Sequence, residues 1–149
     1  MSQQNILFED NLIIQHIDKD GKHFDKVSRI EGIAEDSQCE IQLDINCDIY
    51  PIKKQFLYGI MLAKSLNPDG SPSLNSFNYE AYINKNTLME KFDYVMYGKF
   101  FRYTKIDDGR IMVLASFGGL LFSITGQPKA LQNLAMDERV YLLLKKITK

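Results

Sequence analysis

The clearest pattern in the chain is a strict alternation of apolar and polar residues that runs from Cys39 to Cys47. Because successive side chains of a strand point to opposite faces, this alternation predicts a half-buried β-strand. Seven further segments, most of them rich in β-branched or aromatic residues, are predicted as strands. They are Leu12 to Ile17, Phe24 to Ile33, Phe56 to Ala63, Tyr94 to Tyr103, Ile111 to Phe117, Leu120 to Thr125 and Val140 to Lys145.

Turn-forming residues separate these strands. Asp20-Gly21, Tyr50-Pro51 and Asp107-Asp108-Gly109 each mark a reversal or break, which favours antiparallel pairing of successive strands. One short helix is predicted over Pro128 to Met136, because Pro128 suits a first helical position. Residues 67–91 begin with a run of turn formers and predict a long loop. Together these features indicate one all-β domain over residues 1–149, a closed or nearly closed antiparallel barrel of about eight strands.

The composition fits this picture and narrows the function. At 149 residues, 45% apolar and 25% charged, the chain is the size of one globular domain. A net charge of -1 disfavours a protein dedicated to binding phosphate backbones or anionic lipid. No apolar run approaches the roughly 18 residues of a membrane helix, and no basic signal region precedes Glu9 and Asp10, so a soluble intracellular protein is expected. Cys39 and Cys47 lie too far apart along one strand to bridge, which suits a reducing compartment.

Candidate catalytic chemistry is sparse. The spacing of His16 and His23 matches no zinc site with the two cysteines. Between Ile30 and Ile52 there are six acidic residues and no basic one, and this row is predicted to form a solvated acidic strand face through Glu40, Asp44 and Asp48. The sequence holds no recognisable nucleophile, phosphate-binding loop or metal-binding motif, so a small enzyme is disfavoured and neither cofactor nor metal is expected.

Three segments are apolar on both faces: Tyr94 to Tyr103, Leu120 to Phe122 and Tyr141 to Leu144. A barrel strand normally shows its second face to water, so these segments predict a surface that a partner protein covers. The alternative is that the long loop folds over one of them. Gly98 and the Gly118-Gly119 pair are interpreted as bulges or barrel corners, with close docking of a partner as the alternative.

A second function stays open for the aromatic strand. Phe100, Phe101, Arg102 and Tyr103, with Lys99 and Lys105 nearby, are residues that could stack nucleic-acid bases on an OB-type surface. Core packing and protein contacts are commoner uses of such side chains. The acidic stretch of residues 30–52 also argues against a continuous phosphate track. A module that binds single-stranded nucleic acid is therefore the alternative, and not the leading, hypothesis.

Six blocks of the chain carry a resemblance to a known family: Leu7 to Asp10, Phe24 to Ile30, Leu43 to Asn46, Tyr94 to Gly98, Ser116 to Leu121 and Arg139 to Lys146. Together these blocks resemble the eighth, small OB-fold-like subunit common to the eukaryotic RNA polymerases I, II and III. Their order and approximate spacing also fit. Tyr-Val-Met-Tyr-Gly and Phe-Gly-Gly-Leu-Leu are specific together, whereas Leu-Asp-Ile-Asn alone is weak. Residues 67–91, a variable loop in the family, and the ending Ile147-Thr148-Lys149 depart from the pattern.

The resemblance implies an OB-like, Greek-key barrel of eight or nine antiparallel strands with no catalytic residue of its own. It implies a structural subunit of the nuclear polymerases, in the nucleus including the nucleolus, that docks chiefly on the largest subunit and supports assembly and stability. Nucleic acid would be contacted only weakly or indirectly, and no membrane or small-molecule substrate is expected. The predicted partner interface comprises Tyr94, Val95, Met96, Tyr97, Gly98, Phe117, Gly118, Gly119, Leu120, Leu121, Tyr141 and Leu143.

Overall fold

Eight antiparallel strands make up the fold in the computed structural model, which describes residues 6–19, 21, 26–65, 91–106, 109–135 and 138–148. The strands are β1 (Ile6–Ile17), β2 (Val27–Ala34), β3 (Glu40–Asn46), β4 (Leu57–Ala63), β5 (Tyr94–Lys105), β6 (Ile111–Phe117), β7 (Leu120–Gly126) and β8 (Arg139–Thr148). All eight predicted strands are confirmed, although β1 begins six residues before Leu12. The predicted loop lies outside the described residues except for Lys91, as do His23, Phe24 and Asp25.

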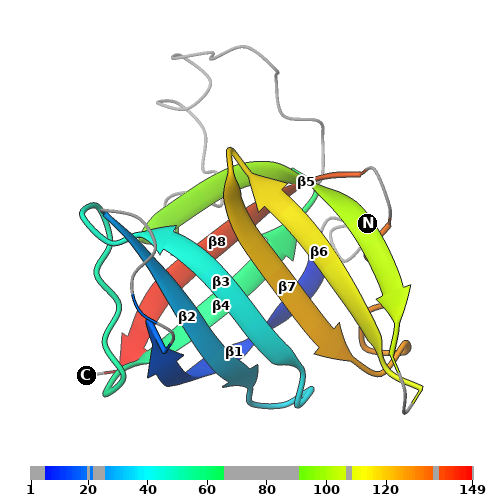
Figure 1. The fold of residues 1–149 in the computed structure, drawn as a ribbon, viewed down its shortest axis with the longest axis horizontal. Coiled ribbons are helices and arrows are strands. Elements are labelled where there is room, and N and C mark those ends of the chain that lie inside the picture. The colour runs from blue at the N-terminus through cyan, green and yellow to red at the C-terminus, as the bar shows by residue number, and fades with distance from the viewer. Residues whose placement is uncertain are drawn as a thin grey trace.

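The strands close into a barrel in the order β1-β2-β3-β7-β6-β5-β8-β4 (Figure 1). Strands β1 to β3 form a meander, and β4 returns to pair with β1, which gives the spatial order 4-1-2-3 of a Greek key. Strands β5 to β8 repeat this arrangement in the order 8-5-6-7. The β3–β7 and β4–β8 pairs join the two Greek keys. The predicted antiparallel, Greek-key barrel is thus confirmed, and its two halves have the same topology.

Alternation along the strands fills the barrel. Strand β2 alternates half-buried and buried residues over its whole length, and β6 does the same. The inward side chains merge into one core, whose largest fully buried members include Tyr58, Phe100 and Phe122. Register shifts in β1 and β5 mark bulges, which increase local twist and help a sheet to close on itself.

The predicted helix over Pro128 to Met136 is wrong for the part that the structure describes. Residues 128–133 form consecutive turns, in which the N–H of Leu131 donates to the carbonyl of Pro128 at 3.1 Å, and the N–H of Leu134 to that of Leu131 at 3.1 Å. This three-residue spacing buries both leucines in the core without a helix, and a segment so short gains little from helical hydrogen bonds. No helix among the described residues is long and apolar enough to cross a membrane.

A buried carboxylate, Asp10, shapes the turn between β2 and β3. It accepts hydrogen bonds from the N–H groups of Asn11 at 2.7 Å, Asp36 at 3.0 Å and Ser37 at 2.9 Å. Burial acts to raise the pKa of Asp10, but the hydrogen bonds from Asp36, Ser37 and Asn11 together outweigh it, so the pKa lies below its ordinary value of 3.8. The ionised form therefore stabilises the folded chain.

We expect Asp10→Asn to lower the free energy of unfolding at pH 7 by roughly 1–3 kcal/mol, the range for a hydrogen-bonded charged group. The stabilisation is fully present above the unfolded-state pKa and is lost as pH falls through the lower folded-state pKa. The difference between wild type and variant should therefore shrink below about pH 4. Urea denaturation at pH 7 and pH 3 measures it, and an equal difference at both pH values would contradict the proposed linkage.

Candidate interaction surface

Strand β5 has two different faces. Tyr94, Met96 and Phe100 point into the barrel and belong to the core. Tyr97 and Phe101 point outward, with 42% and 47% of their surface exposed. The two-sided apolar character that the sequence predicted for this strand is confirmed, and its interior face is accounted for by the barrel itself.

A bulge divides the outer face of β5. The register shifts between Phe100 and Arg102, which places Phe101 and Arg102 side by side on the exposed surface. Beyond the bulge Tyr103 pairs with Val113, a core residue, so Tyr103 belongs to the inner side of the strand although it remains 42% exposed. Strict alternation along β5 would put Tyr103 on the same face as Tyr97, but the extra residue at the bulge reverses the order of faces beyond it.

Tyr97 is held by two residues of β8. It pairs with Tyr141 across the strands, and their ring centroids are 4.6 Å apart. Arg139 donates from Nη1 to the Tyr97 hydroxyl at 3.2 Å, and its guanidinium carbon lies 6.0 Å from the ring centroid. The ring is thus positioned before any partner arrives, which reduces the entropy that binding must overcome.

A small apolar cluster lies outside the barrel core. Met61 and Ala63 of β4 pack there with Tyr141 and Leu143 of β8, against Ile6, Phe92 and Val95. Leu143 is fully buried and Tyr141 nearly so within the chain itself. Both side chains are therefore covered within the chain by itself, and their contact with a partner stays a prediction.

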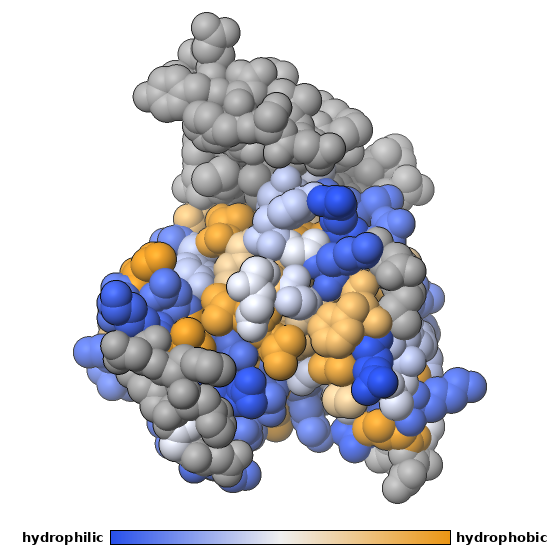
Figure 2. Space-filling model, turned by 45° about the horizontal axis from the view of Figure 1, so that its top comes forward, coloured by the Kyte–Doolittle hydropathy of each residue, from blue (hydrophilic) through white to orange (hydrophobic). Residues whose placement is uncertain are grey.

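The β6–β7 connection is a two-residue hairpin turn. Gly118 and Gly119 both have positive φ, 63° and 94°, and this combination matches the right-handed twist of paired strands. Phe117, before the turn, is a core residue, whereas Leu121, after it, is 43% exposed. Figure 2 looks toward the face that carries this turn and the arch of β5, and hydrophobic patches lie across the middle of it among hydrophilic residues.

The twelve predicted interface residues therefore separate into groups. Tyr94, Met96 and Phe117 lie in the barrel core, and Tyr141 and Leu143 in the outer cluster. Val95 and Leu120 are half-buried, and Tyr97 and Leu121 are exposed. The glycines serve the barrel, because Gly118 and Gly119 form the turn, and a Cβ on Gly98 would lie 2.1 Å from the Ser116 carbonyl oxygen. The exposed part of the surface also includes Lys99, Phe101, Arg102 and Arg139, which are not among those twelve residues.

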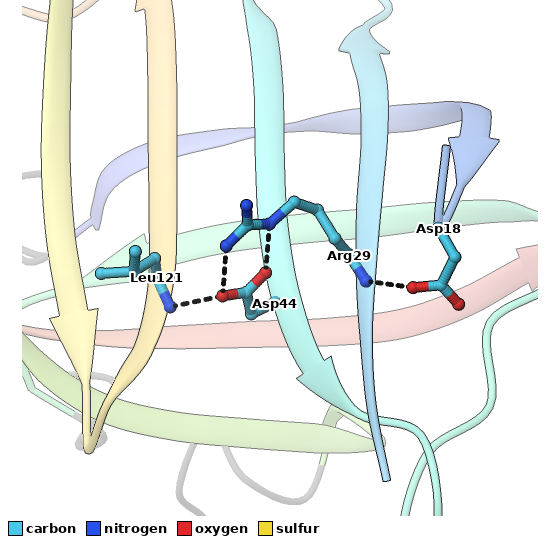
Figure 3. A network of polar contacts seen from close by, with 4 residues as sticks. All are labelled: Asp18, Arg29, Asp44 and Leu121. Atoms are coloured by element: carbon cyan, nitrogen blue, oxygen red, sulfur yellow. Dashed lines mark hydrogen bonds and ion pairs between the residues drawn. The ribbon is translucent and has the colours of Figure 1, made fainter. Parts of the chain in front are cut away.

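The acidic face predicted on β3 is not uniformly solvated. Asp44 is buried, and it accepts hydrogen bonds from Arg29 Nε at 2.7 Å and Arg29 Nη2 at 3.0 Å (Figure 3). It also accepts the N–H of Leu121 at 3.1 Å, just beyond the last β3–β7 pair. The N–H of Arg29 in turn donates to Asp18 at 3.0 Å. Asp44 thus links β3 to β2 and β7 by hydrogen bonds. Glu40 and Asp48 are exposed, as predicted.

We expect Asp44→Ala to lower the free energy of unfolding by roughly 1–3 kcal/mol, because a buried charged hydrogen-bonding group is lost. Glu40→Ala is the matched control, since Glu40 lies on the same strand and pairs with Arg110 at 3.0 Å but is exposed. An exposed ion pair contributes at most about 1 kcal/mol. Urea denaturation measures the free energy of unfolding of both variants. Equal destabilisation would contradict a larger contribution from the hydrogen bonds of Asp44.

Two tyrosines pack together at the start of β5. Tyr50 stacks on Tyr94 at a centroid distance of 5.3 Å and donates its hydroxyl hydrogen to Asp93 at 2.9 Å. Burial raises the pKa of the Tyr50 hydroxyl, and the hydrogen bond to Asp93 raises it further. The Tyr94 hydroxyl accepts the N–H of Asn46 at 3.0 Å. These contacts anchor the start of β5, and so the strand that carries the exposed aromatics.

The other residues that could carry out chemistry, the histidine and the cysteines, do not form a common site in the part of the chain that the structure describes. His16 lies exposed on β1. Cys39 is buried, and burial raises the pKa of its thiol. Both cysteines are free. Within the described ranges no three side chains among His, Cys, Asp and Glu gather in a group that could hold a metal ion.

Comparison with known proteins gives a consistent result. Residues 9–146 match the family model described as RNA polymerase Rpb8. The chain is 46% identical to DNA-directed RNA polymerases I, II, and III subunit rpabc3 of Dictyostelium discoideum, over 95% of this chain and 98% of that protein. It is 34% identical to DNA-directed RNA polymerases II, IV and V subunit 8B of Arabidopsis thaliana, over 99% and 100%. It is 33% identical to DNA-directed RNA polymerases I, II, and III subunit RPABC3 of Saccharomyces cerevisiae, over 95% and 99%.

Proposed function

The chain belongs to the RNA polymerase Rpb8 family and is a subunit of DNA-directed RNA polymerase, and we propose that it acts there as a non-catalytic structural subunit that docks on the largest subunit. The observation that carries the proposal is the family match over residues 9–146, which spans all eight strands except the first residues of β1 and the last of β8. Its partners are other polymerase subunits. We further propose that binding supports assembly and stability of the complex.

The use of the buried carboxylates supports a structural role. Asp10 binds three backbone N–H groups, and Asp44 binds an arginine and a backbone N–H. Both carboxylates are thus occupied by donors of the same chain, which serves architecture better than proton transfer. As a polymerase subunit the chain works in the nucleus, and we extend this to the nucleolus because relatives are named as subunits of polymerase I as well as II and III.

The test is copurification of a tagged chain with the polymerase largest subunit from nuclear extract. We expect the largest subunit in stoichiometric amount, retained at moderate salt because the barrel offers exposed aromatic side chains for a dry contact. Crosslinking within the purified complex then identifies the subunit that contacts β5. Consistent absence of the chain from the polymerase rejects the subunit role, whereas crosslinks only to other subunits reject docking on the largest one.

Binding of single-stranded nucleic acid is a second candidate, favoured by three exposed aromatic residues, Tyr97, Phe101 and Tyr103, beside the cations of β5. It predicts saturable binding of an oligonucleotide whose affinity falls steeply with salt. Titration of the purified chain with a fluorescent 20-nucleotide DNA at near-physiological salt measures this. A flat titration removes the hypothesis.

A further inference from the structure

The net charge of -1 conceals a segregation of charge between the two Greek keys. Strands β1 to β4 carry five carboxylates and one cationic side chain, Arg29, apart from His16. Strands β5 to β8 carry six lysines and arginines and no carboxylate. Since each Greek key makes up one side of the barrel, the two sides have opposite sign.

The strand order places these charges at opposite poles. Strand β5 lies four positions from β2 in either direction around the eight-stranded barrel. Glu31 of β2 is half-buried and Glu40 of β3 exposed on the acidic side, whereas Lys99 and Arg102 are exposed on β5. The chain therefore has a charge dipole directed across the barrel, and a partner's electric field would orient it before contact.

The cationic pole coincides with the exposed aromatics. Every exposed aromatic side chain in the described part of the chain lies on β5. Among the described residues, neither Lys99 nor Arg102 lies within ion-pair distance of a carboxylate. The neighbouring outward positions of β6 and β7 are Met112, Leu114, Ser116, Leu121, Ser123 and Thr125, none of them acidic. Aromatic residues and arginine on an otherwise uncharged surface are the composition of a protein contact centre.

We propose that the outer face of β5, centred on Lys99, Phe101 and Arg102, is the docking face of this subunit and that it receives an acidic, carboxylate-bearing protein segment of a neighbouring polymerase subunit. The inference rests on the proposed function and adds the chemistry of the partner to it. Phe101 supplies apolar area, while Lys99 and Arg102 beside it pair with the partner's carboxylates. The acidic β2–β3 side faces away from that segment, because like charges would repel it.

An acidic protein segment fits this face better than a nucleic acid does. A phosphate backbone needs a cationic track that continues across the binding surface. Here the strand cations lie on β5 and toward the two ends of β8, β6 and β7 carry none, and the strand next to β7 is β3, which begins with Glu40. Carboxylates on a short segment need only the two or three cations that β5 presents.

The test compares two double charge reversals with the same change in net charge. K99E/R102E alters the proposed face, and K53E/K54E alters two exposed lysines in the connection between β3 and β4. Tagged wild type and variants are copurified with the polymerase, and the largest subunit is quantified. We expect roughly tenfold less polymerase with K99E/R102E and the wild-type amount with K53E/K54E. The neutral variant K99Q/R102Q should show a smaller loss, and circular dichroism checks that each variant is folded.

Wild-type recovery with K99E/R102E, or with K99Q/R102Q should K99E/R102E not fold, overturns the proposal while leaving the subunit role intact. Failure of wild type itself to copurify rejects the proposed function instead. A photocrosslinker at Phe101 then identifies the chemistry of the contact within the assembled polymerase. A crosslinked peptide of net negative charge supports the proposal, whereas a basic or uncharged peptide, or a crosslink to nucleic acid, overturns it.

Discussion

Gly98→Ala is expected to destabilise the barrel by roughly 3 kcal/mol, the upper part of the range for overpacking a filled interior. A Cβ at this position would lie 2.1 Å from the Ser116 carbonyl oxygen and 2.6 Å from Phe117 Cδ1. At Gly98 and Lys99 the strand still pairs with β8 while it begins to pair with β6. The obstructing atom belongs to the backbone of β6, so relief requires that a strand of the barrel move.

Gly59→Ala provides the matched control, since Gly59 also lies within a strand and has no positive φ. A Cβ there would meet the ends of two flexible side chains, Ile147 at 3.2 Å and Lys145 at 3.3 Å, which can shift at little cost. Thermal unfolding should show a fall in Tm of roughly 10 °C for Gly98→Ala and almost none for Gly59→Ala. Similar melting of both variants would show that β5 and β6 can separate without penalty.

The strands could be predicted from sequence because their signal is local. In β3 the apolar residues Ile41, Leu43 and Ile45 are buried, and the same period of two is visible in the amino acids themselves. For β5 the sequence indicated only that both faces are apolar, and the structure shows that Tyr94, Met96 and Phe100 form the inner one. The turn at Gly118 and Gly119 is also a local feature of the sequence, because two consecutive glycines readily adopt the two positive φ angles that this hairpin turn requires.

The burial of individual side chains and the distribution of charge depend on strand register and on which strands are neighbours. The local pattern of apolar and polar residues determines neither. Asp44 is buried because Arg29 lies opposite it in the β2–β3 register and Leu121 arrives from a distant hairpin. Leu143 is covered by residues of other segments, including Phe92. The bulge after Phe100 reverses the faces of β5 beyond it. The charge dipole likewise emerges only when the strands are placed around the barrel, since the total charge of the chain is almost zero.

Tyr97→Asp is expected to abolish most assembly with the polymerase while leaving the barrel folded. Tyr97 is 42% exposed and points away from the core, so the free chain can hydrate an aspartate there, and Arg139 next to it offers a counter-charge. In the complex the same carboxylate would be buried against the proposed acidic partner, at a cost of several kcal/mol. Copurification with the polymerase measures the loss, and circular dichroism establishes that the fold survives.

Two variants make the result specific to this face. Ile13→Asp introduces the same charge at an outward position of β1 with nearly the same exposure, 44%, but on the acidic half of the barrel. Tyr97→Phe keeps the ring beside Tyr141 and removes only the hydroxyl that accepts from Arg139. We expect both to copurify close to wild type, because neither places a carboxylate on the β5 face. Equal losses for Tyr97→Asp and Ile13→Asp would mean that added negative charge anywhere impairs assembly, and normal assembly of Tyr97→Asp would place the docking surface elsewhere.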